Sequence, residues 1–456
     1  MERIAEVMEK FKQMDAALKG TLEAFIAPFA AVLPDARYRK TLHQFVPAML
    51  AAGSPQPARA AAYAPEPPAN PWALAKRFFS LLHTSSFSHQ DWLQVLYQDA
   101  RQVVDEAGVT KVLVAVDPVN FEKPYARKLE GISKVYKATP PGSLPQQAPR
   151  ITWGYPAIFG LILNTPHPAV AYLRLFSYTT PDFLSQPMEW MQAFHALRQC
   201  FPERELCVVA DAEADDQKLW REANACDLEF IFRATKTRNI LVHNPHRHGW
   251  EEEELQSLAR IMAGRCHVEV AFQHAGRSIP AHVTLDWFCF RLPDQQERYW
   301  CVVAETHINQ DDLSEEEWRP PRSLVLVTNR PVEDNEAAKQ VYTDWVQRGR
   351  IEHFYRFLQE DGVKVETIQV RTLERFRRML ILVVICALFV LRLAAVWPEE
   401  MIRWLRRVAS STGDTSLDRQ GPYLLLRALQ RVLDAISLLH WMTIDPPPLE
   451  VLPGPT

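Results

Sequence analysis

The chain has 456 residues, of which 47% are hydrophobic, 23% charged and 10% aromatic. These proportions are typical of a folded globular protein and exclude a wholly disordered chain. Lysine and arginine (51) nearly balance aspartate and glutamate (55), so any basic surface for nucleic acid must be local. The seven cysteines form no Cys-x-x-Cys pair. This spacing argues against a zinc ribbon or a disulfide framework and favours a reducing compartment.

The first predicted segment, residues 1–107, is helical. Its first residues are charged and lack the apolar stretch of a signal peptide. Apolar side chains recur with helical spacing up to Pro34, and a second helix is expected from Arg37 to Ala52. Residues 53–71 are rich in proline and alanine and show no periodicity, so we expect a linker there.

The second segment, residues 108–235, predicts the first part of an α/β core. Short runs rich in β-branched side chains predict strands, and helical periodicity predicts the helices between them. The expected order is strand, strand, strand, helix, strand, helix, strand, at residues 111–116, 157–163, 169–176, 187–200, 206–210, 215–225 and 228–233.

The remaining chain divides into three predicted segments. Residues 236–330 contain alternating or continuous apolar runs separated by polar turns, which predicts a β-rich insertion. Helical periodicity returns in residues 331–397, the remainder of the core. Residues 398–456 are expected to form C-terminal helices and a proline-rich tail.

One apolar segment, Met379–Trp397, raises the question of a membrane. Arg392 interrupts it, and the uninterrupted part, Met379–Leu391, has 13 residues. A transmembrane helix needs roughly 20. We therefore expect a buried helix and no membrane partner; a transmembrane or interfacial helix is the alternative.

Two aspartates each follow a hydrophobic run of strand type, Asp117 and Asp211. A residue at the end of a buried strand projects beyond the sheet, where ligands bind in open α/β folds. If the two strands are neighbours, the repulsion between the carboxylates favours a bound divalent cation. Alternatively, each aspartate is a helix cap or a turn residue. Glu213, Asp215 and Asp216 are rival second ligands, but the position at the strand end favours Asp211.

A third acid, Glu352, lies in a helical stretch. Ile351, Phe354 and Tyr355 have the spacing of a core-facing side of that helix, whereas Arg348 and Glu352 are four residues apart and share another face. The alternative interpretation is a salt bridge on a solvated helix, which contributes only tenths of a kcal/mol.

Together these features resemble the DDE transposases of bacterial insertion sequences. The resemblance covers roughly residues 108–397 and includes the stretches VAVDPVNFEKP, VVADAEADDQKLW, LVLVTNRPV and VRTLERFRRMLILVV. The family carries a Tyr-x2-Arg-x3-Glu-x6-Lys signature around its last acid. Arg348 and Glu352 keep this spacing, while Trp345 stands at the tyrosine position and Gln359 at the lysine position. Arg356 or Lys364 could replace that lysine.

The resemblance implies an α/β fold: a ribonuclease-H-like mixed sheet flanked by helices, with a β-rich insertion before the last catalytic acid and helical N- and C-terminal regions. It implies a transposase that binds terminal inverted repeats and cleaves and transfers DNA strands. By the family layout, the helices of residues 1–107 would bind the ends of the DNA element. Asp117, Asp211 and Glu352 would be catalytic and would bind two Mg2+ ions, for which Mn2+ can substitute. The alternative is a catalytically inactive, transposase-derived DNA-binding protein, suggested by Trp345 and Gln359.

The same resemblance implies the partners and the location. The partners would be double-stranded DNA, at transposon ends and at the target, and a second copy in a homodimer on DNA. The location would be the cytoplasm, in association with the nucleoid. Cations and aromatic side chains near the three acids would contact phosphates. The predicted DNA-binding residues are Arg348, Trp345, Gln359, Arg356, Lys123 and Arg233.

Three histidines, His243, His246 and His248, form a second candidate metal site. They lack a cysteine or carboxylate partner at ligand spacing, which favours a solvated or DNA-facing loop instead.

Overall fold

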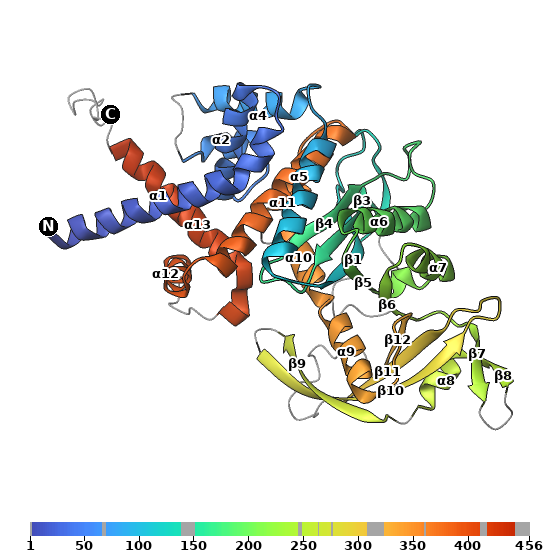
Figure 1. The fold of residues 1–456 in the computed structure, drawn as a ribbon. Coiled ribbons are helices and arrows are strands. Elements are labelled where there is room, and N and C mark those ends of the chain that lie inside the picture. Colours follow the sequence, from blue (N-terminus) through green and yellow to red (C-terminus); the bar gives the residue numbers. More distant parts are fainter. Residues whose placement is uncertain are drawn as a thin grey trace, which may run out of the picture. The chain divides into compact units, whose positions relative to one another are not determined.

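The computed structural model describes residues 2–65, 70–137, 151–244, 249–262, 264–274, 277–307, 323–359, 362–410 and 417–442. The chain packs as two compact units, whose elements are labelled in Figure 1. The helical unit combines Met1–Trp92 with Phe357–Thr456, and the sheet unit is Leu93–Arg356.

The helical unit is built from helices near both ends of the sequence. The predicted break at Pro34 is confirmed, because the first two helices are separate and Asp35 caps the second by accepting a hydrogen bond from the Arg37 backbone N–H. That second helix ends at Gly53, whose φ of 53° is favourable for glycine. The helices that lie wholly in this unit are α1 (Glu2–Ala31), α2 (Ala36–Ala52), α3 (Pro57–Ala62), α4 (Pro71–His83), α11 (Leu373–Val396), α12 (Glu399–Ala409) and α13 (Leu417–Met442).

The stretch predicted to be a linker, residues 53–71, is partly a packed helix. Its α3 packs against α2 and α4, and Ala60 and Ala61 are buried. Small alanine side chains let neighbouring helices approach closely, so a segment without an apolar period can still pack. The prediction of a linker is wrong for α3; residues 66–69 lie outside the described residues.

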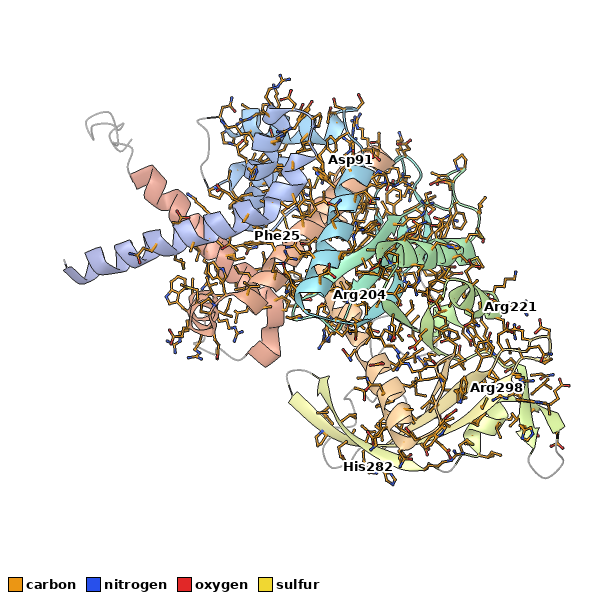
Figure 2. All side chains as sticks on the ribbon, viewed as in Figure 1. Phe25, Asp91, Arg204, Arg221, His282 and Arg298 are labelled. Carbon is orange, nitrogen blue, oxygen red and sulfur yellow. The ribbon has the colours of Figure 1, made fainter. Side chains whose placement is uncertain are left out.

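The helix α11 is the one helix in the described part of the chain that is long and apolar enough to cross a membrane, and 72% of its most apolar window is buried inside the protein. All its residues from Met379 to Val390 are buried. Phe389 packs against Phe25 of α1, with 5.7 Å between the ring centroids; Phe25 is labelled in Figure 2. The guanidinium of Arg392 lies 5.0 Å from the centre of the same Phe25 ring. The prediction of a buried helix for this segment is confirmed.

In the sheet unit, the described residues form one mixed sheet of twelve strands. The order is β2-β3-β1-β5-β6-β12-β11-β10-β7-β8, with β4 beside β3 and β9 beside β10. The strands are β1 (Lys111–Glu122), β2 (Ser133–Tyr136), β3 (Ile151–Ile162), β4 (Ala169–Leu175), β5 (Glu205–Ala210), β6 (Glu229–Arg233), β7 (Asn239–Asn244), β8 (Gly249–Glu254), β9 (Cys266–His274), β10 (Arg277–Arg291), β11 (Tyr299–His307) and β12 (Ser323–Thr328).

Helices flank this sheet, which makes the unit an α/β fold. They are the greater part of α5 (His89–Glu106), then α6 (Gln186–Cys200), the short 3-10 helix η1 (Ala212–Ala214), α7 (Gln217–Ala225), α8 (Leu255–Arg260), α9 (Asn335–Val346) and most of α10 (Gly349–Gln359). The predicted order of core elements is confirmed by β1, β3, β4, α6, β5, α7 and β6. The short strand β2 was not predicted.

The strands of the predicted β insertion continue the core sheet. β12 pairs antiparallel with β6 on one side and with β11 on the other. In the core, β1 is antiparallel to β3 and parallel to β5, and β5 is parallel to β6. The carboxyl ends of β1, β5 and β6 therefore point the same way.

The two faces of the sheet have different neighbours. Val112, Val114 and Val116 of β1 lie in the apolar core that also contains residues of α5, α6 and α7. The ring centroid of Phe159 in β3 lies 6.0 Å from that of Phe354 in α10, so α10 covers the other face. Asp117 is the direct partner of Phe159 in the β1–β3 ladder. Since paired side chains share a face, Asp117 faces α10.

Candidate active site

The strand β1 does not end at Asp117, as the sequence had predicted, but runs on to Glu122. It pairs with β3 from Val114 to Glu122, whereas its pairing with β5 stops at Ala115. The apolar run ends at Asp117 because β1 loses its second neighbour there. Asp117 is thus held by β3 on one side and open on the side toward β5.

The register of the sheet places Asp211 beside Asp117. Ala115 pairs with Val209, and each aspartate lies two residues further along its own strand direction. The end of β5 is fixed by Trp345 of α9, whose Nε1 donates a hydrogen bond to the Ala210 carbonyl oxygen at 3.2 Å. Both carboxylates therefore emerge at the same edge of the sheet.

The helix α10 carries Glu352 in its first turn. Two contacts hold this helix against the core strands. Arg350 donates a hydrogen bond to the Leu163 carbonyl oxygen just after β3, and the Tyr355 hydroxyl donates one to the Asp117 carbonyl oxygen at 2.5 Å. Ile351 is fully buried. Glu352 is thereby brought to the edge where the two aspartates lie.

The guanidinium of Arg348 contacts all three acids. Its Nη2 lies 2.6 Å from a Glu352 Oε1 and 3.6 Å from Asp211 Oδ2, and its Nη1 lies 4.0 Å from Asp117 Oδ1. We call Asp117, Asp211, Glu352 and Arg348 the acid centre. A second cation, Arg233 at the end of β6, reaches Asp211 Oδ1 from 3.4 Å.

Burial and mutual repulsion perturb the charges of the acid centre. Burial raises the pKa of Asp117 to about 8; Arg348 opposes this, and the carboxylates of Glu213, Glu352 and Asp211 add to it. The pKa of Glu213 is also raised, by burial and then by Asp211. Burial lowers the pKa of Arg348, but the three acids outweigh it and the net shift is upward. The centre therefore holds more negative charge than its arginine balances, which favours a further cation.

Two of the three rival acids, Asp215 and Asp216, bond to other groups. Asp215 is fully buried and accepts hydrogen bonds from the backbone N–H groups of Thr235 and Lys236, each at 2.7 Å, and from the Arg238 side chain. Asp216 caps α7. The charge of Glu213 raises the pKa of Asp117. Unlike Asp117, however, Glu213 forms no ion pair with Arg348 among the described residues.

The predicted DNA-binding residues do not all lie together. Trp345 and Arg233 lie at the acid centre, as does Arg348. Arg356 is exposed on α10. Lys123 is only 5% exposed, so it presents little surface to a phosphate. Gln359 belongs to the helical unit, outside the unit that contains the three acids.

Sequence reasoning missed the hydroxyl of Tyr355. The helical spacing assigned this residue to the core, and its ring does lie 5.4 Å from that of Phe159. The spacing gives no signal for the hydrogen bond from its hydroxyl to the Asp117 carbonyl oxygen, because that contact joins residues 238 positions apart. Tyr355 thus helps to position the first aspartate as well as to fill the core.

The donor chemistry of the acid centre suits a hard cation such as Mg2+, which prefers carboxylate oxygens. Arg348 now supplies the positive charge between the acids, and its Nε is buried without a hydrogen-bond partner among the described residues. In the described chain, the three acids are not a group whose ligand atoms all lie within 4.8 Å of one another. Arg348 would have to withdraw for an ion to bind them.

Of the three histidines considered as a second metal site, one lies among the described residues. His243 lies in β7 and its ring meets Trp250 edge-on, at 5.7 Å between centroids. His246 and His248 lie outside the described residues. The three-histidine site therefore stays a prediction.

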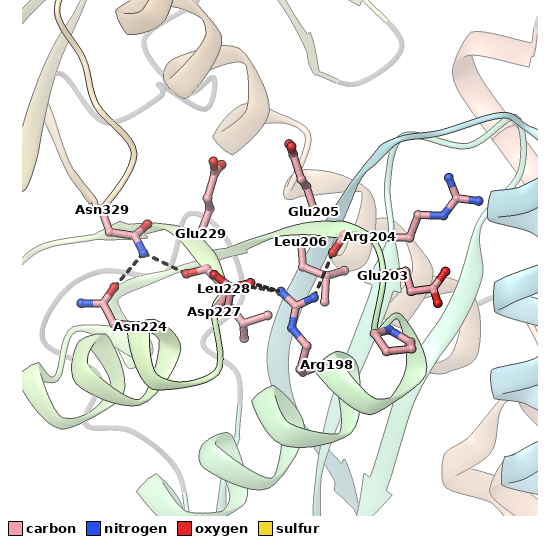
Figure 3. A pocket seen from close by; sticks show the side chains of 11 residues that line it. Arg198, Glu203, Arg204, Glu205, Leu206, Asn224, Asp227, Leu228, Glu229 and Asn329 are labelled. Carbon is pink, nitrogen blue, oxygen red and sulfur yellow. Dashed lines mark hydrogen bonds and ion pairs between the residues drawn. The ribbon is translucent and has the colours of Figure 1, made fainter.

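A pocket opens at the amino ends of β5 and β6 (Figure 3). Its lining residues bond to one another: the Arg198 side chain donates to the Arg204 backbone carbonyl oxygen at 2.9 Å, and the Asn329 side chain donates to that of Asn224 at 2.7 Å. The pocket is at the opposite strand ends from the acid centre. Four acids line it, Glu203, Glu205, Asp227 and Glu229, but they lie at the amino ends of the strands, whereas ligands of open α/β folds bind at the carboxyl ends. We therefore do not assign the activity to it.

Comparisons with known proteins find a distant structural likeness. No protein-family model matches the chain, and no curated protein matches it. The chain resembles a piggyBac transposase in a synaptic complex with hairpin DNA, solved by cryo-EM, with 10% sequence identity and a TM-score of 0.37. The match covers 82% of this chain and 65% of that chain. This chain therefore spans less than two thirds of its neighbour, and a likeness of this strength does not establish a shared activity.

Proposed function

We propose that the chain is a transposase of an insertion sequence, which binds terminal inverted repeats and cleaves and joins DNA strands with Mg2+. One observation carries the proposal: Asp117, Asp211 and Glu352 come from three separate elements, yet all contact the guanidinium of Arg348. The strand order β4-β3-β1-β5-β6, with β1 antiparallel to β3 and parallel to β5, supports a ribonuclease-H-like core. The strands between β6 and α9 fit an insertion before the last acid.

In this proposal Asp117, Asp211 and Glu352 hold two Mg2+ ions, or Mn2+ in their place. The bound ions would neutralise the phosphate and activate a water or a 3′-hydroxyl for attack. The chain itself supplies the positioning. The β ladder fixes Asp117, the Trp345 hydrogen bond fixes the strand end before Asp211, and the first turn of α10 presents Glu352.

The cations of the site would bind the DNA backbone. Once Arg348 leaves the carboxylates, its planar guanidinium can donate to a phosphate through several N–H groups. Arg356, Trp345 and Arg233 lie in the same unit and would extend this contact; Lys123 and Gln359 are further candidates. The proposed partners are the transposon ends, the target DNA and a second copy of the chain, and the proposed location is the nucleoid in the cytoplasm.

A catalytically inactive DNA-binding protein is the second candidate. The observation that favours it is the position of Arg348 itself, which takes up the space between the acids at 2.6 Å from Glu352. An arginine that never withdraws would leave DNA binding intact and prevent the binding of metal.

The test is a strand-cleavage and strand-transfer assay. The full chain is incubated with Mg2+, or with chelator, and duplex DNA carrying the short inverted repeats that bracket the gene. We expect Asp117→Asn and Glu352→Gln to reduce cleavage at least ~10³-fold, equivalent to about 4 kcal/mol of barrier. Asp216→Asn is the matched control, because asparagine also caps a helix.

Three outcomes separate the candidates. Cleavage by the wild type and by Asp216→Asn, lost in the other two variants, supports the transposase. Sequence-specific binding without cleavage supports the inactive protein. Full cleavage by Asp117→Asn or Glu352→Gln would remove the acid centre from the mechanism.

A further inference from the structure

Two neighbouring helices of the sheet unit bring together a second set of metal-ligand side chains. Glu222 and Cys226 are one helical turn apart, the Cys226 backbone N–H donating to the Glu222 carbonyl oxygen at 2.9 Å at the end of α7. Residues with this spacing share a face of the helix. α6 packs beside α7 and carries His195 (Figure 1).

The imidazole of His195 lies between the other two side chains and presents one ring nitrogen to each. The Cys226 Sγ lies 3.5 Å from His195 Nδ1, and the His195 Nε2 lies 2.7 Å from Glu222 Oε1. One ligand atom from each residue lies within 4.8 Å of the other two, the one such group in the described part of the chain. Ligand atoms around a tetrahedral Zn2+ are about 3.5 Å apart, given Zn–S of about 2.3 Å and Zn–N of about 2.0 Å.

We propose that His195, Glu222 and Cys226 bind a Zn2+ ion, separate from the acid centre. A thiolate and a carboxylate give two negative charges, which the ion neutralises, and three protein ligands leave a position for water. The donors also set the metal: sulfur and imidazole favour Zn2+ over Mg2+, whereas the three carboxylates of the acid centre favour Mg2+.

The arginine next to the candidate site is Arg198. Arg198 does not compete with the ion for the thiolate, since its donors reach the carbonyl oxygens of Cys226 at 3.0 Å and Arg204 at 2.9 Å. The Arg198 side chain instead holds the turn that presents the thiol.

The site is accessible to an ion from solvent. The side chain of His195 is 60% exposed and that of Glu222 is 26% exposed, while Cys226 is buried. A bound ion would link α6 to α7, which both pack on the same face of the sheet. We therefore expect Zn2+ to stabilise the fold of this unit, independently of any reaction at the acid centre.

The experiment measures Zn2+ binding to the full chain after removal of metals by chelator. Competition calorimetry should give one Zn2+ per chain, and Zn2+ should raise the midpoint of thermal unfolding. We expect His195→Gln and Cys226→Ser each to weaken the affinity at least ~100-fold, because even second-shell changes around a metal weaken binding by about 10–100-fold. X-ray absorption of the zinc complex should show one sulfur at about 2.3 Å.

Two matched controls separate this site from other thiols and from the acid centre. Cys289→Ser changes a half-buried thiol of β10 and should leave the affinity unchanged. Asp211→Asn should also leave it unchanged, so failure of the cleavage assay has no bearing on this proposal. His195 is exposed, so His195→Gln tests the site even if Cys226→Ser fails to fold. Equal affinity in the wild type and His195→Gln, or loss of the ion in Asp211→Asn, would overturn the proposal.

Discussion

Two buried arginines, Arg348 in the sheet unit and Arg378 in the helical unit, have contrasting partners. Arg348 is surrounded by the three carboxylates of the acid centre and leaves its own Nε without a partner among the described residues. Arg378 meets one carboxylate, Glu374, at 3.0 Å. Its remaining donors reach carbonyl oxygens of the chain at Leu82, Thr84 and Phe87.

The contrast distinguishes Arg378, whose charge supports the fold, from the acids around Arg348, whose charges are suited to binding a ligand. Around Arg378, one positive group faces one negative group and the other donors are satisfied, which is the arrangement that stabilises a buried ion pair. Around Arg348 the acids outnumber the cations, and burial raises the pKa of Asp117 to about 8. Such a surplus destabilises the fold, and it is typical of residues kept for function. Four predictions test this comparison.

The largest effect is expected for Arg348→Met, which removes the charge and keeps the apolar stem. Without divalent ions, the free energy of unfolding should fall by about 4–5 kcal/mol, because the partly buried Asp117 and Asp211 and the exposed Glu352 lose the buried cation between them. Denaturant unfolding, monitored with and without Mg2+, measures this. Mg2+ should recover a large part of the loss. If it recovers none, the acids do not form a cation site.

The corresponding change in the helical unit is Arg378→Met. We expect a loss of about 3–4 kcal/mol, since Glu374 and three carbonyl oxygens lose their donor. The same unfolding measurement applies, and here Mg2+ should have no effect. Recovery by Mg2+ in both variants would mean that the ion acts on the whole chain and that the two arginines do not differ.

The third prediction concerns pH and Glu374. Burial would raise the pKa of Glu374, but hydrogen bonds from His89 and Arg378 outweigh it and hold the pKa at about 2, below the ordinary 4.5. A lowered pKa stabilises the fold above about pH 4.5, and this stabilisation is lost as the pH falls toward 2. The side chain is 38% exposed, so solvent screening reduces the contribution to about 1–2 kcal/mol.

Glu374→Gln should therefore lower the free energy of unfolding by about 1–2 kcal/mol at pH 7. Unfolding curves recorded from pH 7 down to pH 2 should show the wild type and the variant converging. A constant difference across that range would contradict the assignment of the pKa.

The smallest effect is expected for Asp117→Asn in buffer without divalent ions. With a pKa of about 8, Asp117 must take up a proton when the chain folds at pH 7. Asparagine removes this cost and should raise the free energy of unfolding by about 1 kcal/mol, while DNA cleavage is lost. Thermal unfolding measures the gain, with Asp216→Asn as the control. A loss of stability would mean that Asp117 supports the fold as Glu374 does.

Local patterns in the sequence predicted the elements but not their partners. The break at Pro34 and the apolar period of α11 are properties of neighbouring residues, and both were confirmed. The extension of β1 beyond Asp117 depends on β3, and the pairing of β12 with β6 joins distant parts of the chain. Neither pairing can be predicted from a short stretch of sequence, because tertiary contacts decide which strands pair.

The same limit applies to the sites. The spacing of Arg348 and Glu352 predicted their shared face, and the two side chains are 2.6 Å apart. That Arg348 also reaches Asp117 and Asp211 depends on how α10 lies on the sheet. His195 and Cys226 belong to different helices and form no motif, so no signal in the sequence could have joined them.

The continuous ladder of β1 has a consequence for motion. Asp117 lies within a run of paired residues from Val114 to Glu122, so its main chain cannot shift without breaking several hydrogen bonds. Glu352 lies near the beginning of α10, in a short helix that starts anew after α9 ends at Val346. In the proposed reaction, rearrangement would therefore fall on that helix, and amide hydrogens there should exchange with solvent sooner than those of the strand.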